Sequence, residues 1–240
     1  MDHIETIIES KKDTIKIITI NKPLKKNAID RSMYLRIANI LNDTAKDEDT
    51  SIMVITGTGD YYSSGNDLVA SLETPPQENL KTISTFVKAF VEFPKLLVAI
   101  VNGPAIGIAA TTLALCDLVF ASENSFFYTP FTKLGFVAEG CSSFTFPRLI
   151  GDRKAAEMLL YNHKMSANEA LQCGFINYVY KPEEIQCKVW DKITEVSKLP
   201  TKCVSASKKL LRGSIQEKLL RVNDKEIQEL ENIWATGEAF

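Results

Sequence analysis

The sequence predicts an α/β fold with a helical C-terminal part, and three observations support it. The stretch Leu96–Ala121 has no charge before Asp117 and reads as a buried strand, a glycine turn and a buried helix. A strand, a helix and a strand over residues 14–56 form a βαβ unit. From residue 186 onward the patterns are those of amphipathic helices.

Composition places the chain among soluble globular proteins. Of its 240 residues 45% are hydrophobic and 24% charged, which is enough to build a core. The net charge of -2, without a basic block, argues against nucleic acid as a partner, and no apolar run predicts membrane insertion. Because no repeat or linker divides the chain, we expect a single domain over 1–240, with a core over about 1–190 and a helical part over about 191–240.

Cysteine and histidine usage excludes several chemistries. The odd number of cysteines, with no C-x-x-C pair, predicts reduced core residues in an intracellular protein. Only His3 and His163 supply imidazoles, so we expect neither a metal site nor a Ser/His/Asp triad. The N-terminus lacks a signal or transit composition, and the C-terminal Gly-Glu-Ala-Phe is not a peroxisomal address. The cysteines are Cys116, Cys141, Cys173, Cys187 and Cys203.

The first half of the chain alternates strands and helices. Thr14–Ile20 predicts a β-branched strand, and Ser32–Ala45 has apolar residues at helical spacing with Asp30 as its N-cap. Ser51–Thr56 is the next strand, and Leu80–Phe93 is an amphipathic helix ending at a proline.

The glycine turn inside the organising stretch has two interpretations. Residues 102–104 end the strand, and Gly107 precedes an apolar helical run over Ile108–Cys116. The first N–H groups of a helix have no intrahelical partner, so this turn is suited to stabilising an oxyanion. Alternatively, the glycine only allows the strand and the helix to pack closely.

A second polar segment, Tyr61–Leu68, is hinged on Gly65. It is suited to presenting a backbone N–H to a ligand, with Asp67 capping the helix that follows. The preceding Gly57-Thr58-Gly59 does not continue into a dinucleotide-binding motif, because Tyr62 occupies the third glycine position.

Glu139 is the single carboxylate between Glu123 and Asp152 and lies among aromatic and aliphatic residues. If it is enclosed, its charged form is disfavoured and its pKa rises toward the range useful to a general base. The alternative is an exposed glutamate at the N-terminus of a helix over Ser142–Leu149, where negative charge is favourable.

The C-terminal third predicts one short strand, Asn177–Tyr180, and mostly helices. Capping-box patterns occur at Ser166/Glu169 and Ser214/Glu217. The amphipathic helices expected here are Gln186–Lys198, Lys202–Arg212 and Ile215–Trp234, which are suited to covering the core or to contacting other subunits.

Three segments together resemble the crotonase, or enoyl-CoA hydratase/isomerase, superfamily. They are Asn27-Ala28, the run Ser63–Leu68, and Val101–Gly107 continued to Cys116-Asp117. Their order and spacing cover almost the whole chain. With Glu139–Ser143, they look most like the peroxisomal-type Δ3,Δ2-enoyl-CoA isomerases of that superfamily.

The resemblance implies a crotonase-like spiral of ββα units with C-terminal helices, an acyl-CoA thioester as substrate and no cofactor. It implies an oxyanion hole made by the backbone N–H groups of Ser64 and Ile108, and Glu139 as the base. It also places several residues along the CoA moiety or the pocket, namely Lys25, Asn27, Ala28, Gly65, Asn66, Asp67, Leu68 and Gly107.

Departures from the hydratase pattern favour isomerisation. The two glutamates with which hydratases activate water correspond to Thr111 and Phe131, neither of which transfers a proton. The resemblance therefore implies an isomerase that moves a 3-cis or 3-trans double bond of an acyl-CoA to the 2-trans position in unsaturated fatty acid β-oxidation.

Alternative functions remain open at this stage. One is an enoyl-CoA hydratase or a dienoyl-CoA isomerase, and another is a non-catalytic acyl-CoA-binding or protein-binding module of the same fold. The resemblance also implies a homotrimer or a dimer of trimers, and a peroxisomal or mitochondrial location.

Overall fold

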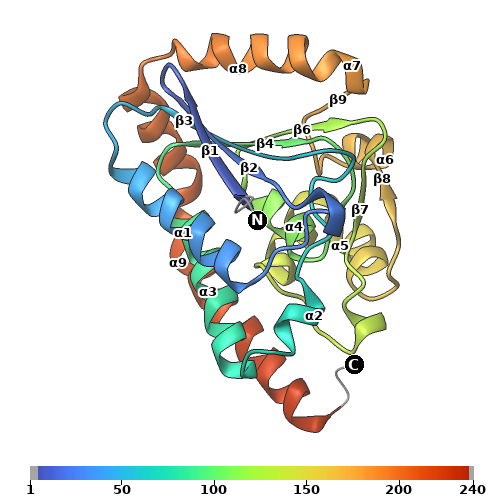
Figure 1. The fold of residues 1–240 in the computed structure, drawn as a ribbon. Helices are drawn as coiled ribbons and strands as arrows, with labels where there is room; N and C mark the ends of the chain where they lie inside the picture. The colour runs from blue at the N-terminus through green and yellow to red at the C-terminus, as the bar shows by residue number, and fades with distance from the viewer. Residues whose placement is uncertain (1–4, 238–240) are drawn as a thin grey trace.

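The computed structural model describes residues 5–237, so His3 and the final Glu-Ala-Phe lie outside the described residues. A six-stranded sheet forms the centre of the fold (Figure 1), with strand order β1-β2-β3-β4-β6-β9. Only β1 runs antiparallel to its neighbour in this sheet. The strands are β1 (Ile7–Lys12), β2 (Ile15–Ile20), β3 (Ile52–Gly57), β4 (Leu96–Val101), β6 (Leu118–Ser122) and β9 (Tyr178–Tyr180).

Both faces of the sheet are buried, which explains the continuous apolar runs of β3 and β4. Val54 and Val98 point to one face, where they pack in a small cluster with Ile193 of α8 (Trp190–Ser197). Met53 and Leu97 point to the other face and join the main core. Successive residues of a strand alternate between faces, so a strand covered on both sides has no polar face.

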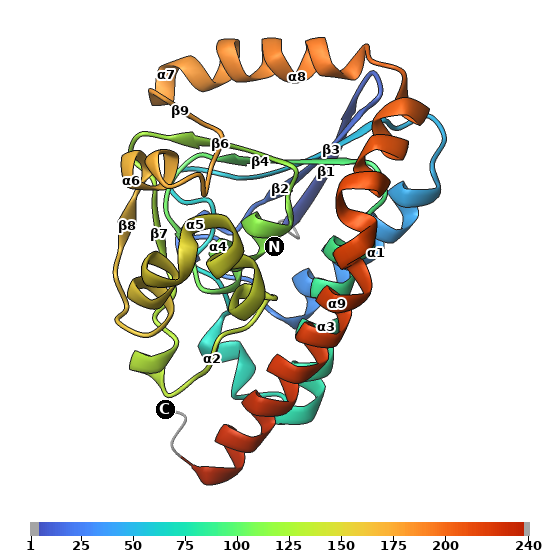
Figure 2. The ribbon, with the colours of Figure 1, turned by 180° about the vertical axis from the view of Figure 1, so that it is seen from behind.

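Three long helices lie side by side along one flank of the molecule: α1 (Arg31–Lys46), α3 (Pro76–Glu92) and α9 (Thr201–Thr236) (Figures 1 and 2). In both views α8 runs over the opposite side of the sheet, preceded by the short α7 (Pro182–Glu184) and a π-helical turn over Ile185–Val189.

The remaining elements gather below the sheet beside the three long helices (Figure 2). A small second sheet has the order β5-β7-β8. Its neighbours are short helices and one longer helix that is kinked at Gly151. These elements are β5 (Ala105–Ile106), β7 (Phe126–Tyr128), β8 (Met165–Ser166), α2 (Leu68–Ser71), α4 (Ile108–Thr111), α5 (Ser142–Leu159), α6 (Ala167–Gln172), and 3-10 turns over Pro23–Lys25, Thr112–Leu115 and Thr132–Leu134.

The α/β class and the helical C-terminal part are confirmed. Strand β4 has the predicted bounds, and the side chain of Asp30 accepts a hydrogen bond from the Met33 amide as the N-cap of α1. Ser166 and Glu169 form the predicted capping box of α6. The run after Gly107 begins as α4 but continues as a 3-10 turn, not as one α-helix to Cys116.

Two predictions, one about the C-terminal helices and one about the cysteines, are wrong. The helices expected on either side of Gly213 and Ser214 are one continuous helix, α9, because packing along α3 supports the helix through the glycine. The cysteines are not all core residues: Cys116 and Cys141 are buried, whereas Cys187 and Cys203 are exposed. No helix among residues 5–237 is long and apolar enough to cross a membrane.

Candidate active site

One pocket brings together most of the residues predicted to act on a ligand. Its wall is mainly apolar and comes from α2, α3, the turn before α4, the loops after β7, and α9. Glu139 is the one carboxylate among the described residues that line it. The lining residues are Ser64, Asn66, Leu68, Ser71, Asn79, Leu80, Ile83, Ile106, Gly107, Ile108, Pro130, Phe131, Leu134, Phe136, Glu139, Leu230 and Trp234.

The two glycine segments meet through backbone pairing. A parallel bridge joins Ser63 to Ala105, and the Ile106 amide donates to the Ser63 carbonyl at 3.0 Å. A Cβ at Gly65 would lie 2.5 Å from the Ile106 carbonyl oxygen, so only glycine permits this approach. The segments after β3 and after β4 thus form adjacent parts of the same pocket wall.

The structure corrects the prediction for the Ser64 amide. This N–H donates to the Lys26 carbonyl at 2.9 Å, so it is not free to bind a ligand. Asn66 pairs with Ile29 in a parallel bridge whose hydrogen bonds use the Gly65 carbonyl and the Asp67 amide. In such a bridge the N–H of the paired residue points the opposite way, and none of the described residues accepts a hydrogen bond from the Asn66 amide.

The second amide, that of Ile108, begins α4. The Gly107 carbonyl accepts hydrogen bonds from the Ala110 and Thr111 amides in the first turn of α4. Because Ile108 is the first residue of this helix, its N–H has no intrahelical acceptor, and no other acceptor is present among residues 5–237. Gly107 reaches this geometry with φ 59° and ψ -129°, a conformation open essentially to glycine. The prediction that Gly107 presents the Ile108 amide therefore agrees with the local backbone.

Glu139 lies in the loop between β7 and α5, where the surroundings disfavour its charge. Burial, reinforced by the negative charge of Glu226, raises the pKa of Glu139 to about 8. No hydrogen bond contributes to this shift. Glu139 lines the pocket and is only partly exposed, so the alternative of an exposed turn glutamate is wrong. A carboxyl group with this pKa takes up and releases protons near neutral pH.

The positions that match the water-activating glutamates of hydratases carry no carboxylate. Thr111 is fully buried, and its hydroxyl donates to the Ile108 carbonyl at 3.2 Å. Phe131 lines the pocket with an aromatic ring. Glu139 has no second acid beside it in the pocket lining described here.

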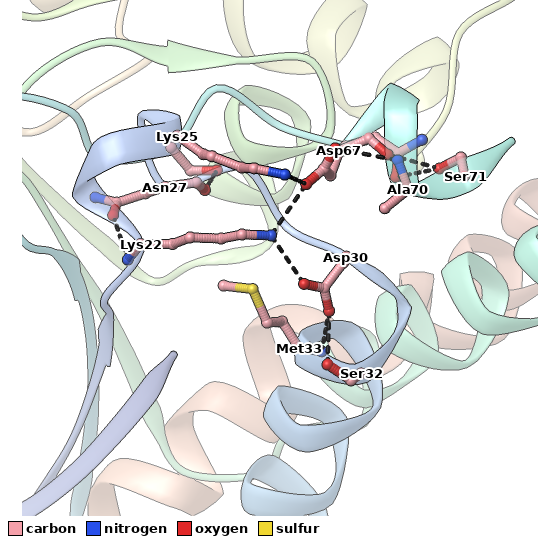
Figure 3. Close-up of polar contacts among 11 residues, drawn as sticks. Lys22, Lys25, Asn27, Asp30, Ser32, Met33, Asp67, Ala70 and Ser71 are labelled. Carbon is pink, nitrogen blue, oxygen red and sulfur yellow. Dashed lines mark hydrogen bonds and ion pairs between the residues drawn. The ribbon is translucent and has the colours of Figure 1, made fainter. Parts of the chain in front are cut away.

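A cluster of charges lies next to α2 (Figure 3). The Lys22 ammonium contacts Asp30 at 2.9 Å and Asp67 at 3.0 Å, and Lys25 reaches the same Asp67 oxygen at 3.5 Å. Burial by itself raises the pKa of Asp67, but the hydrogen bonds from Lys22 and the Ala70 amide outweigh this effect, and the pKa lies below its ordinary value. Asp67 thus caps α2, as predicted, and holds the basic loop against the pocket segment.

The side chain of one predicted ligand-binding residue, Asn27, is structural instead. The fully buried side chain of Asn27 donates to the carbonyls of Thr58 and Tyr61 and accepts from the Lys22 amide, so its amide group faces no ligand. Ala28 is buried beside it. The side chain of Lys25 is 60% exposed and remains accessible to an anionic ligand.

Two functional candidates have no signal in the sequence. In the sequence, Lys22 cannot be distinguished from the other basic residues of its loop. In the structure, its ammonium group donates hydrogen bonds to both Asp30 and Asp67 (Figure 3). Glu226 lies far along the chain from Glu139 and influences its charge only after folding. Residues 5–237 contain no cluster of metal-ligating side chains, and His163 contacts Glu169.

Comparison with known proteins assigns the family. The model of the enoyl-CoA hydratase/isomerase family matches residues 10–239. The chain belongs to this family. Human "enoyl-CoA delta isomerase 2" is 42% identical over 98% of the chain and 61% of its own length, and mouse "enoyl-CoA delta isomerase 3, peroxisomal" is 43% identical over 92% and 71%.

A solved structure supports the same family and fold. The crystal structure of an enoyl-CoA hydratase/isomerase from Pseudoalteromonas atlantica covers 98% of this chain and 93% of its own, with a TM-score of 0.92 and 30% identity. The crotonase-like fold predicted from the sequence is therefore confirmed. The chain spans about three fifths of the length of the human relative.

Proposed function

We propose that this chain is a Δ3,Δ2-enoyl-CoA isomerase, which converts a 3-cis- or 3-trans-enoyl-CoA to the 2-trans isomer. The observation that supports this most strongly is Glu139, the single carboxylate that residues 5–237 contribute to an apolar pocket, together with two backbone amides that have no acceptor within those residues. The names of the human and mouse relatives agree with this activity.

The first step is proton abstraction at C2. The Glu139 carboxylate takes the C2 proton, and the electrons of the broken C–H bond delocalise over C1 to C4 as a dienolate. Negative charge develops on the thioester oxygen. A base with a pKa of about 8 is suited to this transfer because its proton affinity matches the working pH.

The two amides stabilise the dienolate. We assign this oxyanion hole to the N–H groups of Asn66 and Ile108. Asn66 takes the place expected for Ser64, because the Ser64 amide donates to the Lys26 carbonyl. Removal of one such donor typically lowers kcat by about 10²- to 10³-fold. Both groups are backbone amides, so their position depends on the turns around Gly65 and Gly107.

The second step returns the proton at C4. Glu139, now protonated, delivers it to C4, where the electrons of the C3–C4 double bond form the new C–H bond. The C1–C2 electrons of the dienolate form the C2–C3 double bond, and the thioester carbonyl is restored. One carboxylate suffices because it both removes and returns the proton. Hydration would require a second group to activate water, which neither Thr111 nor Phe131 provides.

A paired assay tests this function. The same preparation is supplied with a 3-enoyl-CoA and a 2-trans-enoyl-CoA, and the conjugated double bond is followed by absorbance. We expect isomerisation of the first and little hydration of the second. Hydration as the faster reaction would favour the hydratase alternative, and acyl-CoA binding without either reaction would favour a binding module.

The remaining expectations belong to the same proposal. Acyl-CoA is the substrate, and no cofactor participates because the proton transfer needs none. The peroxisomal name of the mouse relative supports a peroxisomal location for this chain. Assembly as a homotrimer or a dimer of trimers stays a prediction.

A further inference from the structure

The turn that carries Glu139 has an unusual backbone. The two residues that follow it, Gly140 and Cys141, both have left-handed φ values of 68° and 64°. A Cβ at Gly140 would lie 2.3 Å from the Thr111 hydroxyl, so the turn also packs tightly against α4. Backbone N–H groups in a turn form an anion-binding concavity, and here the Cys141 and Ser143 amides both donate to one carboxylate.

The anion at this concavity is a side chain of the same protein. Glu226 of α9 is 5% exposed and accepts hydrogen bonds from the Cys141 amide at 2.7 Å and the Ser143 amide at 2.9 Å. Its carboxylate also accepts from the Ser143 hydroxyl at 2.6 Å. Cys141 and Glu226 are 85 residues apart in the sequence. This contact therefore fixes the turn, which leads into α5, to a helix that is distant in the sequence.

The same helix forms part of the pocket wall. Leu230, four residues after Glu226, lines the pocket, as does Trp234 another four residues on. Residues at this spacing share one face of a helix. Helix α9 therefore contacts the base-bearing turn through Glu226 and encloses the substrate pocket through the next two turns.

Charge connects Glu226 to Glu139 as well. Burial raises the pKa of Glu226 to about 6, although its hydrogen bonds from Ser143 and Cys141 oppose the rise. Glu226 is consequently ionised at neutral pH, and its charge contributes to the raised pKa of Glu139.

The other titratable groups around this pair come from three elements. Burial raises the pKa of Tyr34 in α1 well above 10, and the negative charge of Glu139 adds to this rise. Burial and the negative charge of Glu226 raise the pKa of the Cys141 thiol far above its ordinary value, so the thiol stays neutral. Lys225 and Glu229 of α9 line an outer cavity beside Glu226.

We propose that Glu226 is a positioning residue for the isomerase reaction: its carboxylate fixes the turn that carries Glu139 and places a negative charge near that base. This inference rests on the proposed function. Glu226 touches no reacting atom in this account and acts only through the turn and through its charge.

The test compares Glu226→Gln with Glu229→Gln, an exposed carboxylate three residues further along the helix. The pH dependence of kcat/KM with a 3-enoyl-CoA is measured for both variants. Loss of the negative charge at position 226 lets Glu139 ionise more easily. The rise of kcat/KM with pH in Glu226→Gln should therefore lie about one pH unit below that of the wild type. We expect kcat at high pH to fall roughly tenfold, because the base is weaker and an amide nitrogen now faces an N–H donor, with KM little changed. Glu229→Gln should behave as wild type.

A second readout does not depend on turnover. Carbon-13 NMR titration of the Glu139 carboxyl group, assigned by its loss in Glu139→Gln, should show a lower pKa in Glu226→Gln than in wild type. If wild type lacks isomerase activity, the proposed function fails, but the titration still tests the electrostatic part. An unchanged pKa and an unchanged pH profile in folded Glu226→Gln would overturn the inference.

A milder variant covers the case in which Glu226→Gln does not fold. Ser143→Ala removes the hydroxyl donor to Glu226 and leaves both carboxylates in place. We expect kcat to fall roughly threefold or more at constant KM, because Glu226 loses one of its three hydrogen-bond donors and keeps the two backbone amides. Wild-type kcat in this variant would show that the Glu226 contact does not position the base.

Discussion

At the scale of single residues, Glu139 combines a suitable proton affinity with a cost to stability. The folded state raises its pKa from an ordinary value of 4.5 to about 8, mainly through burial. Between these values the folded protein binds more protons than the unfolded chain, so stability falls as pH rises through this window. A residue that is favourable for chemistry is here unfavourable for folding.

This linkage predicts a more stable variant. Glu139→Gln has no charge to bury, so its melting temperature should exceed that of wild type by a few degrees at pH 8–9, with little difference near pH 5. Thermal unfolding of both proteins across pH 5–9 provides the measurement. Parallel curves over the whole range would mean that Glu139 ionises as easily in the folded state as in the unfolded chain.

Gly107 sets the direction of the Ile108 amide. A β-branched residue cannot adopt its φ of 59° and ψ of -129° without strain, so Gly107→Val should displace the turn. We expect kcat to fall by about 10²-fold or more, the scale of losing one oxyanion donor. Steady-state kinetics on a variant with native circular dichroism checks this, and normal turnover would reassign the turn.

Lys25 tests the binding of the CoA phosphates. Its ammonium lies 3.5 Å from Asp67, next in sequence to the pocket residues Asn66 and Leu68, and the side chain is exposed enough to meet an anion. Lys25→Ala should raise KM several-fold at low ionic strength and less at high salt, with kcat nearly constant, because salt screens exposed charges. A KM that is the same as wild type at both salt concentrations would remove Lys25 from the binding surface.

At the scale of elements, a partly buried ion-pair network anchors the start of α9. Lys208 donates to Asp117 at 2.7 Å and to the Lys95 carbonyl at 2.7 Å, while Arg212 donates to the carbonyls of Leu115 and Cys116. These bonds attach α9 to the segment between α4 and β6. The anchor fixes one end of the helix whose other end encloses the pocket (Figure 2).

Removing the shared carboxylate should loosen this helix. Asp117→Asn leaves the Lys208 ammonium, whose side chain is only 11% exposed, without its counter-charge. We expect a loss of about 2–4 kcal/mol in the free energy of unfolding, measured with urea. Glu217→Gln, which breaks the exposed pair with Arg221, is the matched control and should cost less than about 0.5 kcal/mol. Equal effects of the two variants would contradict the anchoring role.

The elements differ in how well local sequence predicts them. Strand β4 and the N-cap of α1 were predictable because an apolar run and a capping aspartate act over a few residues. Strand β1 was not predicted, because Glu9 and Lys11 interrupt the apolar run that would indicate a buried strand. The break expected at Gly213 was wrong because the contact with α3 is a tertiary effect.

At the scale of the whole molecule, the pocket joins segments that lie far apart in the sequence. Glu139 and the turn at Gly107 could be identified from local patterns and from the family resemblance. The direction of the Asn66 amide could not, since it depends on the pairing of Asn66 with Ile29 in the folded state. The contact of Glu226 with Ser143 likewise exists only once α9 has packed.

The central claim is that Glu139 carries the proton between C2 and C4, and kcat of Glu139→Gln on a 3-enoyl-CoA tests it most directly. Glutamine keeps the size of the side chain but cannot accept a proton at neutral pH. We predict that kcat falls by about 10²- to 10⁴-fold while acyl-CoA affinity, measured by calorimetry, hardly changes. A folded variant that binds acyl-CoA and keeps more than about a tenth of wild-type kcat, well outside that range, would contradict the account.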